Sequence, residues 1–209
     1  VVSVVKFRKA IIASGSQMRS HSSVEDAIQV EDIYRNAPNE KKLLIVGNTP
    51  SAIEAATVLS KTNNVSLLAE GNILPTFERQ LVKLVERALS KNIKIRTELT
   101  DEDSFDQIIL ATHREPQTNT LQLEHANVQC TDGYISIDAS CQTSNPKIYA
   151  VGECADCNHS AALAIAQGRV AAESACGIDA HLDSNYVPKV VWSSPEIAQC
   201  GSFDTTNTA

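Results

Sequence analysis

Cys154 and Cys157 are separated by two residues in the sequence C-A-D-C, the spacing of a dithiol pair. Such a pair at a helix N-terminus can perform thiol–disulfide exchange, because the helix dipole stabilises one thiolate. Together with His159 the pair supplies three possible zinc ligands, but a fourth ligand at a recognisable spacing is missing. The 6 cysteines in 209 residues are too sparse for a disulfide framework, so we expect reduced thiols, with dithiol exchange as the alternative. His125 and His181 belong to no acid or nucleophile pattern and are expected at the surface.

Residues 47–52 read G-N-T-P-S-A, close to the dinucleotide-binding pattern G-x-G-x-x-G/A. A strand that stops at glycine and turns into a helix presents backbone N–H groups to an anion such as a pyrophosphate. Gly47 and Ala52 match the first and last positions of the pattern. Thr49 replaces the middle glycine and Pro50 removes a possible N–H donor, so the sequence predicts weakened phosphate binding. A purely structural strand–turn–helix is the alternative.

Glu70 follows the next predicted strand, at roughly the 20-residue separation where an acidic residue accepts a hydrogen bond from a ribose hydroxyl. Its carboxylate would repel a 2′-phosphate and no arginine neighbours it, which favours NAD over NADP. A solvated turn carboxylate is the alternative interpretation of Glu70. Gly15 and Gly152 likewise end strand-like runs, so both are further candidate phosphate-facing turns.

The elements that would position these residues alternate between strand and helix. Residues 42–46 form a short apolar run, typical of a strand buried on both faces of a parallel sheet. A β-α-β-α-β unit between Lys42 and about Arg96 is completed by a helix from Ser51 to near Asn63, a strand at 65–68, an amphipathic helix at 81–89 and a strand at 93–95.

The remaining pattern predicts a second set of elements. Strands are expected within residues 1–13 and at 108–111, 134–138, 147–151 and 187–192, and helices at 24–30 and 161–175. The last helix is rich in alanine and contains Gly168, so its small-residue face must approach something closely.

Composition and charge exclude several classes of protein. The formal net charge of -7 and the pI near 5.2 give no electrostatic footprint for nucleic acid. The sequence lacks both a long apolar span and the residue order of a signal peptide, so we expect no membrane association and a cytoplasmic or organelle-matrix location. Aromatic residues make up 4% of the chain while small aliphatic residues dominate, which favours an α/β fold.

Four segments, in this order, match one family. They are residues 10–16 (A-I-I-A-S-G-S, against apolar-A-T-G-S), the fingerprint strand and helix at 43–56, residues 108–118 (I-I-L-A-T-H-R-E-P-Q-T, against A-T-G-R-x-P-N-T) and residues 143–153 (T-S-N-P-K-I-Y-A-V-G-E, against T-x-x-P-x-I-[YF]-A-x-G-D). The chain resembles the flavin-dependent pyridine nucleotide-disulfide oxidoreductases, the family of dihydrolipoamide dehydrogenase and mercuric reductase. Residues 190–196 resemble the start of that family's dimer-interface domain.

The resemblance implies a Rossmann-like NAD(P)-binding domain inserted into part of an FAD-binding α/β domain. The expected parts are residues 1–35 (partial FAD-binding domain and linker), 36–118 (NAD(P)-binding domain), 119–183 (return to the FAD-binding domain) and 184–209 (start of the interface domain). It also implies FAD and NAD(P)H as cofactors and a homodimer, although most of the interface domain is missing from this sequence. The candidate cofactor-binding residues are Gly15, Gly47, Thr49, Ala52, Glu54, Glu70, His113, Gly152, Glu153, Ala161 and Ala162.

Several of these residues depart from the family pattern or allow an alternative interpretation without cofactor binding. Glu54 matches a family carboxylate near the flavin, with a polar helix face as its alternative. His113 stands where glycine is usual, and Glu153 replaces the aspartate that holds the FAD ribitol. Because Cys154 and Cys157 lie in this ribitol-binding segment, the resemblance argues against redox chemistry by this pair.

The family's first FAD fingerprint and redox-active cysteine pair precede the matched region, and its catalytic His–Glu pair follows it. The sequence therefore predicts an incomplete relative that is inactive alone, part of an FAD-dependent NAD(P)H:disulfide or metal oxidoreductase. Two alternatives stay open: a flavin-free, non-catalytic NAD(H)-binding module, and an inactive fragment.

Overall fold

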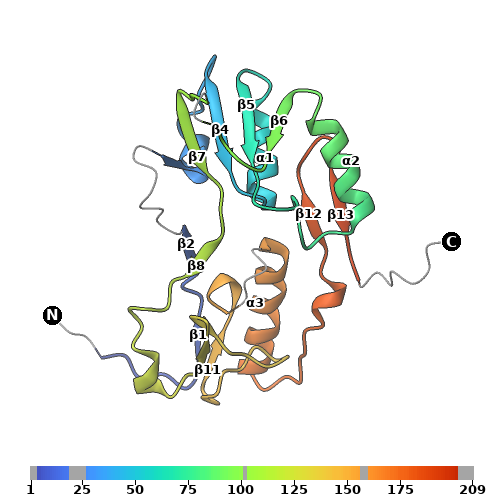
Figure 1. Cartoon of the computed structure of the whole chain (residues 1–209). Coiled ribbons are helices and arrows are strands. Elements are labelled where there is room, and N and C mark those ends of the chain that lie inside the picture. Colours follow the sequence, from blue (N-terminus) through green and yellow to red (C-terminus); the bar gives the residue numbers. More distant parts are fainter. Residues whose placement is uncertain (1–3, 19–26, 101–102, 156–159, 202–209) are drawn as a thin grey trace. The chain divides into compact units, whose positions relative to one another are not determined.

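The computed structural model of the chain describes residues 4–18, 27–100, 103–155 and 160–201 (Figure 1). The chain divides into two compact units, each with its own buried apolar clusters. Within the described residues, unit 1 comprises residues 4–17, 114–155, 160–189 and 200–201, and unit 2 comprises residues 18, 27–100, 103–113 and 190–199. Parallel strands joined through helices confirm the predicted α/β class.

Unit 2 is built on a parallel sheet. Its five strands lie in the order β3 (Ile28–Gln29), β7 (Gln107–Leu110), β4 (Lys42–Val46), β5 (Asn64–Leu68) and β6 (Ile93–Arg96). In the central strand β4, the side chains of Leu43, Leu44 and Ile45 are at most 2% exposed, so both faces are buried as the apolar run predicted. The sheet's carboxyl edge therefore brings together the loops that follow β4, β5 and β7.

Two helices pack against unit 2's sheet. They are α1 (Pro50–Leu59) and α2 (Arg79–Leu89), and their buried side chains share one cluster with alternate residues of the strands. Thr49 caps α1 at its N-terminus. Glu78 caps α2, because its carboxylate accepts the N–H groups of Gln80 (2.6 Å) and Leu81 (3.3 Å). These caps fix where each helix begins, directly after the loops that line the carboxyl edge.

A pair of short strands, β12 (Lys189–Val191) and β13 (Ile197–Gln199), contributes to unit 2 from the C-terminal part of the chain. Val191 and Ile197 are buried in the same apolar cluster as α1 and α2. The side-chain oxygen of Gln199 also accepts the N–H of Glu78 at 2.7 Å. Residues remote in sequence thus complete the core of unit 2.

Unit 1 contains the parallel strand pair β1 (Ala10–Ile12) and β11 (Ile148–Ala150), followed by the long helix α3 (Ala161–Ala175). The bounds of α3 agree with the prediction, and Ser160 caps it by accepting the N–H of Leu163 at 3.2 Å. The remaining elements of the chain are short: β2 (Ser16–Met18) with β8 (Arg114–Pro116), β9 (Cys130–Thr131) with β10 (Tyr134–Ile135), and the 3-10 turns η1 (Val30–Tyr34), η2 (Leu123–Ala126), η3 (Gly152–Cys154) and η4 (Ser184–Tyr186). Of these, η1 lies in unit 2, where Val30 and Ile33 join the apolar cluster.

The structure corrects some predicted elements. The helix expected at 24–30 falls partly outside the described residues, and Ile28 instead pairs in parallel with Ile109 as an edge strand. The strand expected at 134–138 ends after Ile135, because the Asp138 carboxylate accepts hydrogen bonds from Ser140 and Gln142 and closes a turn. Among residues 4–13, only 10–12 form a strand.

Within the described residues, the chain passes between the two units after residues 17, 113, 189 and 199. The predicted cofactor and interface domains, with boundaries after residues 35, 118 and 183, are not tested by this division into compact units. The assignment of each part to a cofactor domain stays a prediction.

Candidate dinucleotide site

Gly47 ends β4 in a conformation that only glycine adopts without strain. Its φ is +143°, and a Cβ atom at this position would collide with the carbonyl of Ala111, directly after β7. The close approach of these two chain segments therefore requires glycine. It brings the turn after β4 and the end of β7 together at the carboxyl edge of the sheet.

Thr49 occupies the place of the middle glycine and bridges two segments. Its Oγ1 donates to the Ala111 carbonyl at 2.8 Å and accepts the N–H of Ala52 at 3.3 Å. The Thr49 carbonyl accepts the N–H of Ile53 at 3.2 Å, and Pro50 has no N–H. Ala52 is fully buried, so its small side chain allows close packing of α1 against the sheet. These bonds leave part of the loop's N–H groups available.

The available donors are the backbone N–H groups of Asn48, Thr49 and Ser51, which make no hydrogen bond within the described residues. They lie at the start of a ten-residue helix, where the helix dipole favours an anion. Despite Thr49 and Pro50, the loop therefore keeps N–H donors of the kind that bind a phosphate.

Glu70, two residues after the end of β5, is exposed, and its carboxylate has no partner within the part of the chain that the structure describes. Asn48 links its loop to the glycine turn. The Asn48 Nδ2 donates to the carbonyls of Glu70 (3.2 Å) and Asn72 (3.4 Å), while the Asn48 carbonyl accepts the N–H of Leu74 at 2.8 Å. The structure thus brings the predicted residues Gly47, Thr49 and Glu70 to one edge.

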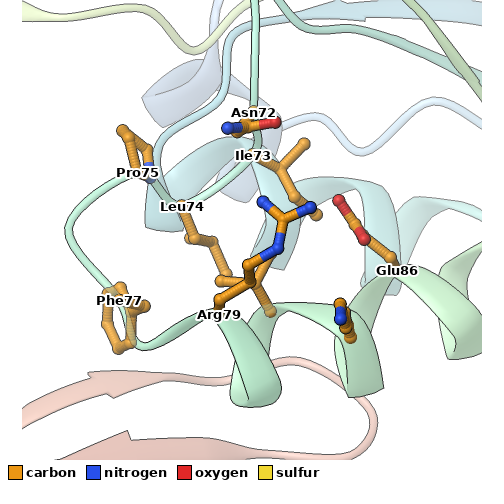
Figure 2. A pocket seen from close by; sticks show the side chains of 9 residues that line it. Asn72, Ile73, Leu74, Pro75, Phe77, Arg79 and Glu86 are labelled. Carbon is orange, nitrogen blue, oxygen red and sulfur yellow. The ribbon is translucent and has the colours of Figure 1, made fainter. Parts of the chain in front are cut away.

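The outer side of the same loop forms a pocket of about 180 Å³ with α2 (Figure 2). Its apolar wall consists of Ile73, Leu74, Pro75, Phe77 and Val82, and Asn72, Arg79, Lys83 and Glu86 surround it. Ile73 and Leu74 are almost fully buried in the apolar cluster of unit 2 and thereby anchor the loop. Leu74 adopts φ +48°, an unfavourable value for a branched residue, so its buried contacts hold it there.

Glu54 lies on α1 and is half-buried. Its Oε1 accepts the N–H of Trp192 at 3.0 Å, a contact across 138 residues that sequence reasoning missed. Burial raises the pKa of the Glu54 carboxyl, and the hydrogen bond from Trp192 partly opposes this effect. The Glu54 carboxylate is therefore partly buried and hydrogen-bonded, and does not lie on a fully solvated helix face. His113 is exposed beyond β7.

In unit 1, three segments converge on Glu153. Ser16 Oγ donates to Glu153 Oε2, and Arg114 Nε lies 2.6 Å from Ser16 Oγ and 3.1 Å from the same carboxylate oxygen. Arg114 Nη2 also donates to the Ser16 carbonyl at 2.9 Å. Gly15 and Gly152 supply the positive-φ turns beside Ser16 and Glu153. The predicted residues Gly15, Gly152 and Glu153 therefore gather, whereas the roles of Ser16 and Arg114 were missed.

The end of β11 is held by α3. Gly152 N–H donates to the buried side-chain oxygen of Gln167 at 2.7 Å, and a Cβ at Gly152 would lie 3.6 Å from that of Ala164. The contact of Gly152 with Ala164 is therefore an ordinary van der Waals contact. The close approach predicted around Gly168 is wrong for that residue, because no atom lies within 4 Å of its Cβ position in the described residues. Ala161 is exposed and Ala162 half-buried in the first turn of this helix.

Cys154 is fully buried, with its thiol 3.2 Å from the carbonyl of Val151. Cys157 and His159 lie outside the described residues. Within the described ranges, His, Cys, Asp and Glu side chains nowhere cluster as metal ligands would. None of the described helices has the length and apolar character needed to cross a membrane.

The family model for pyridine nucleotide-disulphide oxidoreductases matches residues 2–173, and the chain belongs to this family. Dihydrolipoyl dehydrogenase of Bacillus subtilis is 30% identical over 224 residues, covering 93% of this chain and 48% of the relative. Dihydrolipoyl dehydrogenase of Thermus scotoductus is 31% identical, covering 91% and 48%. The chain thus spans about half the length of the curated relatives it matches.

Two solved structures share the fold. LpdA from Mycobacterium tuberculosis has a TM-score of 0.79 at 21% identity, covering 90% of this chain and 47% of that one. RclA from Escherichia coli, described as an HOCl-induced flavoprotein disulfide reductase, has a TM-score of 0.78 at 18% identity, covering 91% and 50%. The predicted family and fold class are therefore confirmed.

Proposed function

We propose that this chain is the nucleotide-binding part of an FAD-dependent oxidoreductase that uses NADH, similar to dihydrolipoyl dehydrogenase. The observation that carries the proposal is that N–H donors and a carboxylate, without partners among the described residues, lie at one sheet edge. The donors of the Gly47 loop suit a pyrophosphate, and Glu70 suits the hydroxyls of the adenosine ribose.

The residues of unit 1 fit an FAD ribitol less directly than the Gly47 loop fits a pyrophosphate, because the Glu153 carboxylate already binds Arg114 and Ser16. Glu153 retains a carboxylate that can accept a hydrogen bond from a ribityl hydroxyl, and Arg114 and Ser16 hold that carboxylate in place. When bound, NADH and FAD would supply the hydride donor and acceptor. The chain's own residues would bind and orient the two dinucleotides.

Several features of the whole protein belong to the same proposal. They are a disulfide or metal substrate, a homodimer, and a cytoplasmic or organelle-matrix location. Because the chain spans about half of its relatives, the redox cysteine pair and the His–Glu pair of the family are not assigned to any residue of it.

A flavin-free NADH-binding module is the second candidate, and the ion pair in unit 1 favours it. The Arg114 Nε atom lies 3.1 Å from Glu153 Oε2. A ribityl hydroxyl would therefore have to share a carboxylate that already forms an ion pair. An inactive fragment is the third candidate, favoured by Thr49 in the place of a glycine and by Pro50.

The visible absorption spectrum separates these candidates. The spectrum of the purified chain is recorded first without additions. It is recorded again after FAD is added and unbound flavin is removed, and a third time after NADH is added. Flavin bands that NADH bleaches are expected for the oxidoreductase. A colourless chain that still enhances NADH fluorescence would indicate the flavin-free module, and a chain that retains neither nucleotide would contradict both binding functions.

A further inference from the structure

Asn48 differs from its neighbours in the glycine loop because its side chain reaches a second loop. Both hydrogen bonds of its Nδ2 go to backbone carbonyls of that loop, those of Glu70 at 3.2 Å and Asn72 at 3.4 Å. A primary amide has two N–H donors, so both are used. The backbone carbonyl of Asn48 adds a third bond, from the N–H of Leu74 at 2.8 Å.

These three hydrogen bonds restrict the backbone position of the loop that carries Glu70. Glu70 is exposed and its side chain has no partner in the described chain, and Gly71 follows it with φ +77° and no atoms near its Cβ position. Before this segment, Ala69 is buried and its N–H donates to the Arg96 carbonyl at 2.9 Å, and after it Ile73 and Leu74 are buried. Between these anchors, the hydrogen bonds to residues 70–72 within the described chain come from the Asn48 side chain. Without the Asn48 amide, the carbonyls of Glu70 and Asn72 would each lose the side-chain donor that ties them to the glycine loop.

A carboxylate discriminates between a ribose hydroxyl and a 2′-phosphate only while it is fixed near that position. Near a hydroxyl it accepts a hydrogen bond, whereas near a phosphate it faces like charge. A loosened loop lets the carboxylate move away, which removes the hydrogen bond and the repulsion together. The preference between the two nucleotides then falls, although the overall charge of the site is unchanged.

We propose that Asn48 is the positioning residue that sets the preference of this chain for NADH over NADPH, acting through Glu70. This inference rests on the proposed nucleotide-binding function. It assigns to Asn48 a role in specificity that is separate from phosphate binding, because the phosphate-facing N–H of residue 48 belongs to the backbone and persists in any non-proline variant.

The test compares dissociation constants for NADH and NADPH, measured by fluorescence titration, in the wild type, Asn48→Ala, Glu70→Ala and the double variant. We expect Asn48→Ala to lower the NADH preference about tenfold, consistent with the loss of two hydrogen bonds. Glu70→Ala should lower it at least as much. The double variant should show no additional loss, because both changes act on one interaction.

Asn63→Ala is the matched control. Asn63 also uses its Nδ2 to tie segments of unit 2, donating to the carbonyls of Pro38 and Leu59 at 3.0 Å, but it lies directly before β5, at the amino end of that strand. It should lower stability without changing the nucleotide preference. An equal loss of preference in this control, an unchanged preference in Asn48→Ala, or additive effects in the double variant would overturn the proposal.

Hydrogen exchange separates failure of this inference from failure of the proposed function. In the nucleotide-free chain, Asn48→Ala should accelerate exchange of the Leu74 amide and its neighbours, while Asn63→Ala should not. If the wild type binds neither nucleotide, the proposed function and the preference both fail, yet the exchange result still reports whether Asn48 fixes the loop. Unchanged exchange in Asn48→Ala would remove the structural basis of the inference.

Discussion

Gly47 is a residue at which the geometry of the carboxyl edge of the unit 2 sheet depends on the absence of a side chain. We expect Gly47→Ala to lower the free energy of unfolding by more than about 2 kcal/mol, because a Cβ meets the Ala111 carbonyl and the φ of +143° strains any other residue. Urea unfolding followed by tryptophan fluorescence measures the change. The chain's single tryptophan, Trp192, belongs to unit 2 and reports on it.

The control for this substitution is Gly71→Ala. Gly71 also has a positive φ, +77°, but nothing lies within 4 Å of its Cβ position. Its replacement should cost only about 1 kcal/mol, the conformational term alone. Equal losses for the two variants would show that the contact with Ala111 does not restrict residue 47.

At Glu54, the pKa predicts a pH-dependent stability. Because burial raises the folded-state pKa above the ordinary value of 4.5, the contribution of this group is fully present below pH 4.5 and is lost as the pH rises through the folded-state pKa. Glu54→Gln keeps an oxygen that can accept the Trp192 N–H but carries no charge. The variant should therefore gain stability relative to the wild type between pH 4 and pH 7. Urea unfolding at both pH values measures the gain, and a difference that is constant with pH would contradict the assignment.

Residue-scale contacts were only partly predictable from the sequence. The spacing of the dinucleotide motif drew attention to Gly47 and Glu70, and the structure places both at the carboxyl edge of the unit 2 sheet. The bonds from Trp192 to Glu54 and from Arg114 to Ser16 join residues 138 and 98 positions apart. No periodic signal marks such pairs, because the fold alone brings them together.

At the scale of elements, α2 offers adjacent residues with opposite environments. Val85 is 0% exposed and Leu84 is 51% exposed. We expect Val85→Ala to cost about 2 kcal/mol through lost burial and an unfilled cavity, and Leu84→Ala to change stability by less than about 0.5 kcal/mol. Urea unfolding of the two variants tests the register of this helix, and a larger loss in Leu84→Ala would mean that α2 packs with another face.

The elements of unit 2 were largely predictable because their signals are local. The apolar run of β4 and the helical spacing in α1 and α2 arise from burial against one sheet. The edge strand β3 was missed because two residues carry no pattern, and Ile28 is extended through its pairing with Ile109. In β10 the alternation continued past the strand, where Asp138 closes a turn with its own side chain.

At the scale of the whole molecule, the chain folds as two units, and its membership of the pyridine nucleotide-disulphide oxidoreductases spans both. Motif order predicted this family because four short matches in sequence order are specific where each alone is weak. The whole protein's reaction stays a proposal, since the chain spans about half of its relatives.

The most direct test of the account is equilibrium titration of the chain with NADH and with NADPH, for the wild type and for Glu70→Lys. The wild type should bind NADH more tightly. Glu70→Lys should reverse the order by at least about tenfold, because a cation then faces the 2′-phosphate. A wild type that binds neither nucleotide, or a preference that Glu70→Lys leaves unchanged, would contradict the placement of the nucleotide at the edge formed by Gly47, Asn48 and Glu70.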